Sequence, residues 1–370
     1  MTALAITAVQ IPLTPDGGTS AAGESPDGAT DFHACQALRE AHEHEKWGNL
    51  DRCLTPTEAM EFWRGSDYEE RHLYAARVGG ELVGLCSVTL PLRENTASAG
   101  IDVLVAPAYR RCGWGRRLLE YAESVAATRG RTSLDAYCEI PLEQVERAGI
   151  LLPAKSGVGG LPRDEPSTAF AAGAGYELEQ VERSSRLALP VPSERLEMLE
   201  TEASAYAMDY TVLAWTEACP EEFVVEYAAL KARMSTDVPT AGLDWGAEDW
   251  DVVRVREEEG TLVRSGVQSL VAAAMHSTSG RLAAYTVLNW RPEVPAAVIQ
   301  QDTLVTAEHR GHRLGMQVKL ANLRLAQQRW PAARSVLTWN ANENQHMLAI
   351  NISLGFKPAG YEGEWQKRLG

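Results

Sequence analysis

The sequence contains no run of 18 apolar residues, so no membrane span is expected. Its six cysteines form no CxxC pair and no other metal-ligand spacing, so we expect reduced thiols in a cytoplasmic protein without a metal. Met1–Leu13 has neither a positively charged stretch nor a continuous apolar one, and no signal peptide is expected. Positive charge is not in excess either. The net charge of −15 argues against nucleic acid as a partner and is compatible with a cationic amine.

The chain does have the length and the apolar content for two domains. Its 370 residues suit two domains of ordinary size, and 45% apolar residues are enough to form cores. A stretch near the C-terminus, QDTLVTAEHRGHRLG, repeats one found 200 residues upstream. The corresponding residues are Asp102, Leu104, Val105, Arg110 and Gly115 in the first copy and Asp302, Leu304, Val305, Arg310 and Gly315 in the second. One long period indicates tandem domains rather than a solenoid, whose periods are about 20–50 residues.

Each copy has the pattern of a strand, a turn with arginine and glycine, and the start of a helix. The first backbone N–H groups of a helix have no partner inside it, and the helix dipole favours negative charge there. Gly311 and Gly315 would let a phosphate approach the backbone, and Arg310 and Arg313 would add charge-assisted hydrogen bonds. The alternative is an ordinary turn between a strand and a helix, with arginines on its surface. Two copies in register favour the anion site.

The first copy, VAPAYRRCGWG from Val105 to Gly115, resembles the pyrophosphate loop of the GCN5-related N-acetyltransferase (GNAT) superfamily. The family pattern is Arg or Gln, two residues, Gly, one residue, then Gly or Ala. Arg110, Gly113 and Gly115 match it at every defined position. In the second copy Arg313 stands where a glycine is usual, although it still supplies a backbone N–H.

The resemblance implies an α/β fold of two tandem GNAT-like domains, each a mixed, twisted sheet flanked by helices. We expect the domains over residues 1–190 and 193–370. The layout is similar to that of mycothiol synthase, whose halves are not equally active. Residues 141–166, which are rich in glycine, proline and charge, depart from the family pattern in the first domain.

Local patterns predict several further elements. Residues 14–30 are rich in Gly, Pro, Ser and Asp and are expected to form a loop, after which Asp31 caps a helix. The Gly79–Gly80 pair predicts a hairpin between two strands. A helix is expected over Glu248–Glu259.

The resemblance also implies which residues hold an acyl-CoA, above all acetyl-CoA, as the acyl donor. The strand ends and loops would contact its pyrophosphate and pantetheine. In the first domain these residues are Val103, Leu104, Val105, Arg110, Arg111, Cys112, Gly113, Trp114 and Gly115. In the second they are Thr303, Leu304, Val305, Arg310, Gly311, His312, Arg313, Leu314 and Gly315.

Asparagines follow the next strand of the second domain. The resemblance implies that Asn340 and Asn344 contact the pantetheine arm, because strands that splay apart there leave backbone groups for its amides. The alternative is helix capping, with Asn342 as the N-cap. Asn351 stands four residues before Gly355, where the family often has a tyrosine that protonates the leaving thiolate. Asparagine is no acid, so Asn351 would hydrogen-bond the sulfur or have no role.

A general base is needed because attack on a thioester requires a neutral amine. Asp302 is the carboxylate nearest to the expected reaction centre, and Asp102 repeats it. Strand alternation places Asp302 on the face of Leu304, opposite Gln301 and Thr303, and a bulge would re-aim it. The alternative is that Asp302 is a structural residue that fixes the strand end.

The first domain has no such asparagines, and Ala171 occupies the position of Asn351, so catalysis is expected in the second domain. The predicted reaction is direct transfer of an acyl group, above all acetyl, from CoA to an amine of a small molecule. Two alternatives stay open. One is a non-catalytic acyl-CoA sensor, suggested by the missing tyrosine and by Arg313. The other is a GNAT-fold enzyme that uses a malonyl or carrier-protein thioester. The sequence does not identify the acceptor or the oligomeric state.

Overall fold

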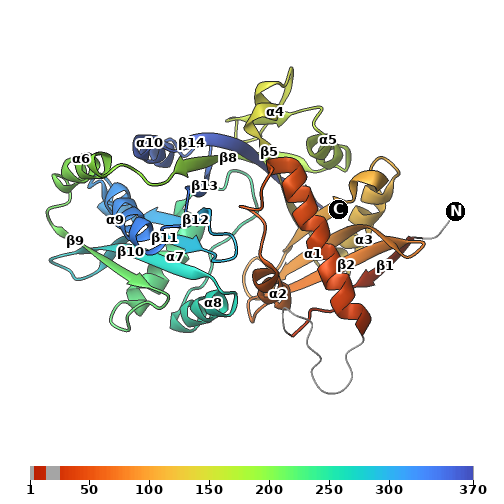
Figure 1. Ribbon diagram of the computed structural model, residues 1–370, viewed down its shortest axis with the longest axis horizontal. Helices are drawn as coiled ribbons and strands as arrows, with labels where there is room; N and C mark the ends of the chain where they lie inside the picture. Colours follow the sequence, from red (N-terminus) through yellow and green to blue (C-terminus); the bar gives the residue numbers. More distant parts are fainter. Residues whose placement is uncertain (1–3, 14–25, 370) are drawn as a thin grey trace. The chain divides into compact units, whose positions relative to one another are not determined.

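The computed structural model describes residues 4–13 and 26–369, which form a mixed α/β fold (Figure 1). The chain divides into two compact units. Unit 1 comprises Met1–Val181, Ala241–Asp244 and Glu362–Gly370, and unit 2 comprises Glu182–Thr240 and Trp245–Tyr361. Two short segments from beyond residue 193 therefore belong to unit 1, where the predicted bounds did not place them.

The unit 1 sheet has the order β1-β2-β3-β4-β5-β14-β8. Its first four strands are antiparallel neighbours, and β4 and β5 run parallel. The strands are β1 (Leu4–Ala8), β2 (Glu69–Val78), β3 (Glu81–Pro91), β4 (Ser98–Val105) and β5 (Ser133–Pro141), with a separate hairpin of β6 (Leu151–Pro153) and β7 (Gly160–Pro162). The helices are α1 (Pro26–Trp47), α2 (Pro56–Arg64), η1 (Pro107–Tyr109), α3 (Trp114–Thr128), α4 (Leu142–Glu146) and α5 (Pro166–Gly173).

The unit 2 sheet has the order β14-β8-β13-β12-β11-β10-β9, and β12 and β13 are its parallel pair. The strands are β9 (Tyr210–Thr216), β10 (Gln268–His276), β11 (Leu282–Trp290), β12 (Ala297–Val305) and β13 (Ser335–Ala341). The helices are α6 (Ser193–Ser204), α7 (Val224–Asp237), α8 (Val252–Arg264), η2 (Ala307–His309), α9 (Leu314–Arg329) and α10 (Gln345–Leu354). Two strands, β8 (Glu177–Ala188) and β14 (Lys357–Arg368), each have one end in either unit.

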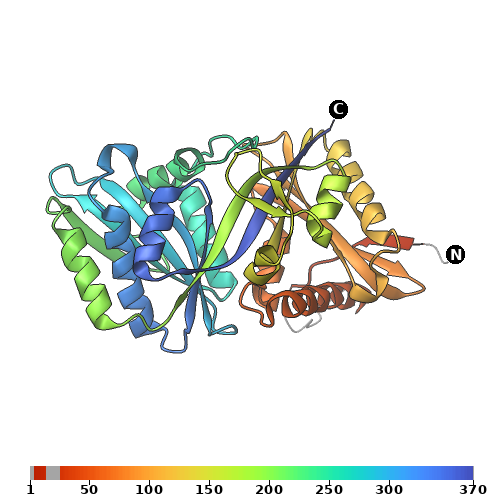
Figure 2. The same ribbon diagram turned by 90° about the horizontal axis from the view of Figure 1, so that it is seen from above.

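Helices cover both faces of the unit 2 sheet (Figures 1 and 2). On one face α9 buries Met316, Leu320 and Leu323, which recur at the spacing of one helix face. On the other face α7 and α8 bury Tyr227 and Val255 against the sheet. The sheet therefore lies between two apolar layers, and any polar group it presents to them needs a partner.

The predicted hairpin is confirmed. Gly79 and Gly80 have positive φ values of 61° and 89°, and Val78 pairs with Glu81 across the turn. Glycine adopts this left-handed backbone without strain, which explains why the chain reverses there.

Two expectations were wrong, and one strand was missed. Helix α1 begins at Pro26, inside the expected loop, whose residues 14–25 lie outside the described residues. Helix α8 begins at Val252 rather than Glu248, because the Asp251 side chain accepts a hydrogen bond from the Arg254 N–H and so caps it. Strand β14 was not anticipated at all.

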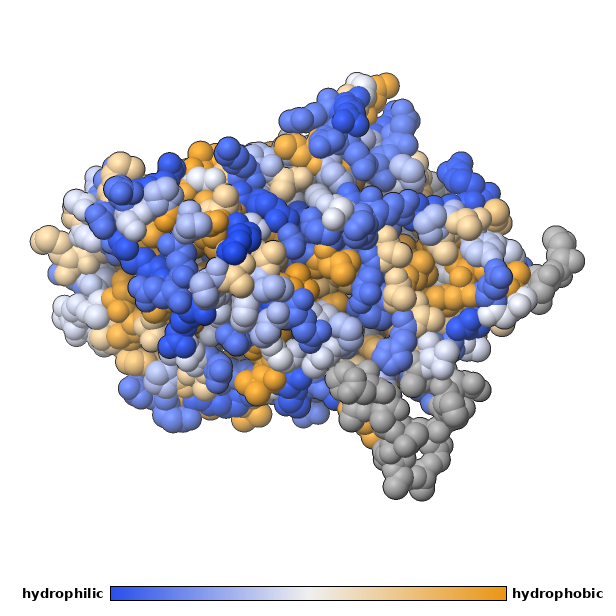
Figure 3. All heavy atoms as spheres, in the orientation of Figure 1, coloured by the Kyte–Doolittle hydropathy of each residue, from blue (hydrophilic) through white to orange (hydrophobic). Residues whose placement is uncertain are grey.

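The surface is of mixed polarity. On the face drawn in Figure 3, hydrophilic residues (blue) alternate with smaller hydrophobic patches (orange). Among residues 4–13 and 26–369, no helix combines the length and the apolar character needed to cross a membrane.

Asn322 links α9 to the sheet and gives a test of this packing. It is fully buried, and its Nδ2 atom donates to the carbonyl oxygens of Leu270 (3.0 Å) and Thr286 (3.1 Å). We expect Asn322→Leu to lower the free energy of unfolding by about 1–3 kcal/mol, because both bonds are lost in a buried place. Urea unfolding measures this. Gln328→Leu, at an exposed position of the same helix, is the control and should change stability by less than about 0.5 kcal/mol.

Candidate active site

Both units have a loop of the same course between a strand and a helix. β4 continues through η1 into α3, and β12 continues through η2 into α9. In each loop an arginine turns back on its strand. The Nε atom of Arg110 lies 3.2 Å from the Val105 carbonyl oxygen, and that of Arg310 lies 3.5 Å from the Val305 oxygen. The guanidinium groups therefore line the loop next to the N–H groups at the helix start, which the helix itself leaves unpaired.

The two loops place their glycines differently. Each has two residues with a left-handed backbone, a conformation that favours glycine. In unit 1 these are Arg111 (φ 64°) and Gly113 (φ 85°), and in unit 2 they are Gly311 (φ 89°) and Arg313 (φ 52°). Unit 1 has its glycine at the second of these positions, whereas unit 2 has its glycine at the first. Arg313 thus replaces the usual glycine while the backbone keeps its left-handed conformation at both places.

The charges at the loops differ as well. In unit 1 the two terminal nitrogens of Arg110 bond to the Glu45 carboxylate at 2.9 and 2.6 Å. In unit 2, no acidic side chain within the described part of the chain pairs with Arg310. An anion would have to displace Glu45 in unit 1, whereas the guanidinium of Arg310 is available in unit 2.

The strands next to each loop diverge. β12 and β13 pair only from Ala297↔Ser335 to Ile299↔Leu337, and residues 300–305 run on without a β13 partner in the described chain. β4 and β5 separate in the same way after Gly100↔Asp135. Backbone groups along an open strand edge need hydrogen-bond partners. The amides of a pantetheine arm are partners of the right kind.

A β-bulge distinguishes β12 from β4. The register of β11 with β12 slips by one residue, so that Gln301 and Asp302 together oppose Val287. In β4 the pairing continues without a shift through Asp102. β12 accordingly has 9 residues where β4 has 8. A bulge is therefore present at Asp302, and unit 1 has none at the matching place. Asp302 nevertheless stays on the face of Leu304, as strand alternation alone predicted, so the bulge does not separate these two side chains.

The bulge changes the phase of the strand. Val298 lies in the core beneath α9, whereas Leu304 lies in the core beneath α7 and α8. An even spacing would put both on one face of a regular strand. Because of the extra residue, the side chains after the bulge face the opposite side of the sheet from the one that alternation from Val298 would give. Asp302 therefore points toward α7, on the same face as Leu304.

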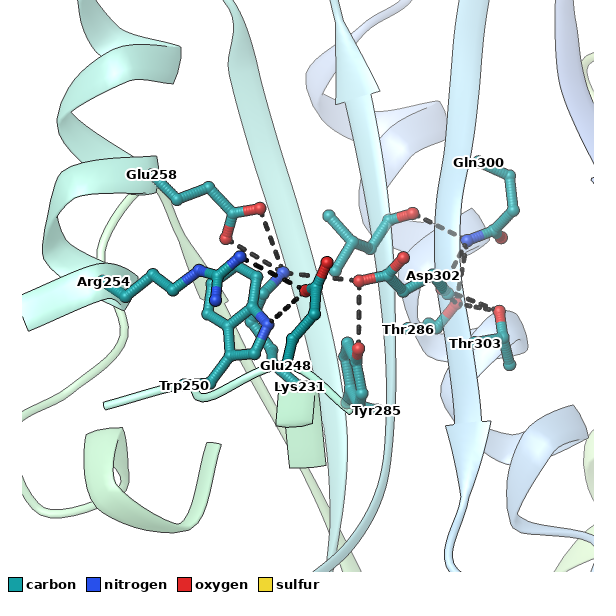
Figure 4. A network of polar contacts seen from close by, with 11 residues as sticks. Lys231, Glu248, Trp250, Arg254, Glu258, Tyr285, Thr286, Gln300, Asp302 and Thr303 are labelled. Atoms are coloured by element: carbon teal, nitrogen blue, oxygen red, sulfur yellow. Dashed lines mark hydrogen bonds and ion pairs between the residues drawn. The ribbon is translucent and has the colours of Figure 1, made fainter. Parts of the chain in front are cut away.

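The Asp302 carboxylate belongs to a polar network under α7 and α8 (Figure 4). Its Oδ2 atom accepts a hydrogen bond from the Tyr285 hydroxyl at 2.9 Å and lies 3.3 Å from Lys231 Nζ. The same Nζ atom lies 2.9 Å from Glu258 Oε2 and 4.4 Å from the centre of the Trp250 ring. Burial disfavours the charge on Lys231, but Asp302 and Glu258 outweigh it and raise the pKa of the amine above its ordinary value. Lys231 is an ammonium that holds Asp302 in place.

Unit 1 has the same pair with arginine, since Arg39 Nη2 lies 2.9 Å from Asp102 Oδ2. This pairing with a cation agrees with a structural role for Asp302. The Oδ1 atom of Asp302, however, has no hydrogen bond within the described residues, and 28% of the side chain is exposed. One carboxylate oxygen is held while the other is open, so the general-base role stays a prediction.

The backbone of Asp302 is held from the other face of the sheet (Figure 4). Its carbonyl oxygen accepts hydrogen bonds from Gln300 Nε2 (3.1 Å), Thr286 Oγ1 (3.0 Å) and Thr303 Oγ1 (2.8 Å). Gln300 Nε2 also donates to the carbonyl oxygen of Val287 at 2.6 Å. Three side chains thus converge on the bulge and compensate for the ladder bonds that it interrupts.

The asparagines divide into a cap and a pair. Asn344, not Asn342, is the N-cap of α10, and its side chain accepts a hydrogen bond from the Met347 N–H at 3.2 Å. Asn351 donates to Asn340 Oδ1 at 2.7 Å. The buried Oδ1 atoms of Asn342 and Asn351 have no donor within the described residues, and such unpartnered groups are uncommon. Amide N–H groups of a pantetheine arm would satisfy them, so this region fits the donor.

The other predicted contact residues differ in exposure, and the half-buried ones are Val103, Leu104, Val105, Trp114, Gly115 and Val305. Leu304, Leu314 and Thr303 have buried side chains, so only their backbone groups can meet a ligand. The loop residues are exposed, namely Arg110, Arg111, Cys112 and Gly113 in unit 1 and Arg310, Gly311, His312 and Arg313 in unit 2. Packing favours a glycine at position 315, because a Cβ atom there would lie 3.2 Å from Ile350 Cδ1 on α10.

Sequence reasoning missed Lys231, Tyr285 and Glu258. A signal for Lys231 was present. It lies four residues after the aromatic Tyr227, and residues four apart share one face of a helix, so an inward Tyr227 implies an inward Lys231. Nothing comparable marks Glu258 or Tyr285, whose role depends on contacts between distant segments.

Comparison with known proteins agrees with this architecture. Residues 36–146, within unit 1, match the model of the acetyltransferase (GNAT) family. No curated protein matched the sequence. A tandem GNAT protein from the clavulanic acid biosynthesis pathway has a similar structure, with a TM-score of 0.73 and 23% identity over 100% of this chain and 99% of that one. A GCN5-related N-acetyltransferase from Sphaerobacter thermophilus has a TM-score of 0.60 and 13% identity over 99% and 96%.

A third similar structure is the glucosamine N-acetyltransferase region of a fungal multi-domain GH3 β-N-acetylglucosaminidase. Its TM-score is 0.62 at 13% identity, over 99% of this chain and 38% of that one. These structural likenesses establish a tandem GNAT fold over the whole chain.

Lys231→Met tests the network around Asp302. The substitution leaves two carboxylates without their cation. We expect it to lower the free energy of unfolding at pH 7.5 by about 2–4 kcal/mol. This loss is smaller than for a fully buried pair, because the Glu258 side chain is 40% exposed. The folded-state pKa of Lys231 is raised, so its contribution is complete at neutral pH and is lost only in strong alkali. The difference from wild type should narrow toward pH 5, because desolvation raises the pKa of Glu258 and its carboxyl group can then take up a proton.

Urea unfolding at both pH values measures the effect of Lys231→Met. Arg281→Met is the control, because it breaks an exposed ion pair with Glu226 and should cost less than about 1 kcal/mol. Equal losses in the two variants would show that the network does not hold Asp302.

Proposed function

We propose that this chain transfers an acetyl group from acetyl-CoA to an amine of a small molecule. The family match of unit 1 and the fold of both units support a GNAT-type acyltransferase. We further propose that unit 2 performs the transfer. The bulge at Asp302 supports this most, because it lies where β12 and β13 diverge and because unit 1 has the divergence without the bulge. The similar tandem protein from clavulanic acid biosynthesis belongs to a small-molecule pathway, in agreement with a small acceptor.

Each part of unit 2 has a role in this proposal. The loop N–H groups and Arg310 would hold the diphosphate of the donor. The open edge of β12 and the Asn342 and Asn351 oxygens would take the amides of its pantetheine arm. The acceptor would approach from the side of α7 and α8, toward which Asp302 points.

In the proposed reaction the amine nitrogen attacks the thioester carbonyl carbon, the carbon–sulfur bond breaks, and CoA leaves as a thiolate. The amine proton passes to Asp302 Oδ1, directly or through a water molecule. Lys231 and Tyr285 keep Oδ2 in place, which leaves Oδ1 as the accepting atom. The thiolate takes its proton from water, because Asn351 has none to give.

A non-catalytic acyl-CoA sensor is the second candidate, and one observation favours it. Oδ2 of Asp302 is already paired with the ammonium of Lys231 and with the Tyr285 hydroxyl, which is the arrangement expected of a structural carboxylate. A sensor would bind acetyl-CoA and release no thiol with any amine.

Calorimetric titration of acetyl-CoA into Gly315→Glu and Gly115→Glu variants tests which unit binds the donor. Each glycine is the second residue of its helix, where the helix dipole tolerates an acid but the new charge meets the expected diphosphate. We expect Gly315→Glu to weaken binding at unit 2 about 100-fold, equivalent to roughly 2.8 kcal/mol, and Gly115→Glu to leave that site unchanged. Gly315→Ala and Gly115→Ala are the matched controls, since they add a methyl group without charge.

Weakened binding in Gly115→Glu alone would contradict the assignment of unit 2. Absence of binding to wild type would contradict acetyl-CoA as donor, and malonyl-CoA and carrier-protein thioesters would then be titrated in the same way.

Asp302→Asn separates the roles proposed for the carboxylate. It keeps the size of the side chain and an oxygen for the Tyr285 hydroxyl but removes the base. We expect kcat for thiol release, measured with a panel of primary amines, to fall about 100-fold or more, with little change in KM for acetyl-CoA. A purely structural role predicts lower stability in urea with kcat within about threefold of wild type.

A further inference from the structure

A lysine is buried beneath the bulge, and residues 4–13 and 26–369 place no acid beside it. Lys319 on α9 is 2% exposed. Its Nζ atom lies 3.2 Å from Gln300 Oε1 and 5.9 Å from the centre of the Phe356 ring. Neither neighbour ionises, and burial lowers the pKa of the amine to about 7. Burying an amine in this way is unfavourable, and a methionine of similar length would fill the space. Packing therefore does not explain a lysine here.

Gln300 connects Lys319 to the bulge. Its Oε1 atom accepts from Lys319, so its Nε2 atom is turned toward the sheet. There it donates to the carbonyl oxygens of Val287 (2.6 Å) and Asp302 (3.1 Å) and to Thr286 Oγ1 (2.9 Å). An amide group fits its site in two orientations related by a flip, and a lysine donor beside it selects the one that donates to the bulge.

Unit 1 gives an internal comparison. In unit 1, Leu119 on α3 takes the place that Lys319 has on α9. Ile101 takes the place of Gln300, because Ile101 pairs with Val88 as Gln300 pairs with Leu288. The other polar residues of the set have apolar counterparts too, namely Cys86 for Thr286, Val103 for Thr303 and Ala122 for Asn322. The polar set is present where β12 has its bulge and absent where β4 is regular.

We propose that Lys319 is a positioning residue for acyl transfer, which acts through Gln300 to fix the bulge of β12 and with it the place of Asp302. The inference rests on the proposed function of unit 2. Lys319 itself lies on the face of the sheet opposite the Asp302 carboxylate and does not touch it. Its effect therefore reaches the reaction only through the shape of the strand.

Two variants and a matched control test the proposal. Lys319→Met removes the donor at nearly constant volume, and Gln300→Glu keeps an acceptor for Lys319 but removes the amide that donates to the bulge. Leu119→Met is the same kind of change at the equivalent place in unit 1. We expect both unit 2 variants to exchange the backbone amides of residues 301–304 with deuterium at least about tenfold faster than wild type, because the bulge is no longer held. Residues 101–104 should exchange as in wild type in all three proteins.

Turnover provides the second readout. In Lys319→Met and Gln300→Glu we expect kcat to fall about 10- to 100-fold, as small misplacements of reacting groups do, with KM for acetyl-CoA within about threefold of wild type. Leu119→Met should leave both constants unchanged.

The pH dependence of stability separates positioning from packing. The folded-state pKa of Lys319, about 7, lies below its ordinary value of 10.5, so wild-type stability should gain from this residue as pH rises between these values. The charged pair between α6 and α9, Glu200 with Arg324, is satisfied within itself. Lys319→Met should therefore melt at a higher temperature than wild type at pH 7, and the difference should shrink toward pH 10.

A lower melting temperature of Lys319→Met at pH 7, or wild-type exchange at residues 301–304 together with wild-type kcat, would overturn the proposal. Failure of the proposed function gives a different result. Wild type would then bind or turn over no acetyl-CoA, while the exchange rates and melting temperatures would still show whether Lys319 holds the bulge.

Discussion

The architecture of unit 2 depends on how one residue, Asp302, is held at a bulge in β12. Its carboxylate reaches Lys231 and Tyr285 on one face of the sheet, and its carbonyl oxygen accepts from Gln300 and two threonines on the other. The bulge breaks the ladder with β11 at the point where β12 also leaves β13. A strand that loses partners on both sides is free to move, and side-chain hydrogen bonds are what can fix it.

The two units share a fold but differ in the residues that would carry chemistry. Both have the divergent parallel strands and the same loop course, and in both the aspartate pairs with a cation on a helix, Arg39 on α1 and Lys231 on α7. In unit 1 the loop arginine is occupied by Glu45 and the strand is regular. In unit 2 the arginine is available and the strand is bulged. These differences, rather than the common fold, decide where an acyl donor would be used.

The repeat in the sequence predicted both loops and the tandem fold, because the glycines and arginines that shape a strand–loop–helix turn are local. The repeat did not reveal the bulge in β12. The hairpins and the loops both keep an offset of 200 residues, yet β12 is one residue longer than β4. The extra residue is offset by one residue fewer between the hairpin and the start of β12, since Ser98 and Ala297, which take equivalent places in the parallel pairs, differ in number by 297 − 98 = 199. Similarly, helical spacing puts Lys231 on an inward face but does not name Glu258, 27 residues away, as its partner.

Two buried lysines on opposite faces of one sheet show how far environment decides the state of a side chain. Lys231 lies between two carboxylates, and its pKa is raised. Lys319 has one amide oxygen, and its pKa falls to about 7. The first neutralises acids that would otherwise repel each other, so it contributes to stability. The second has nothing to neutralise and adds an unfavourable burial. A residue that weakens its own core while orienting an amide at the candidate site is explained by the site rather than by the fold.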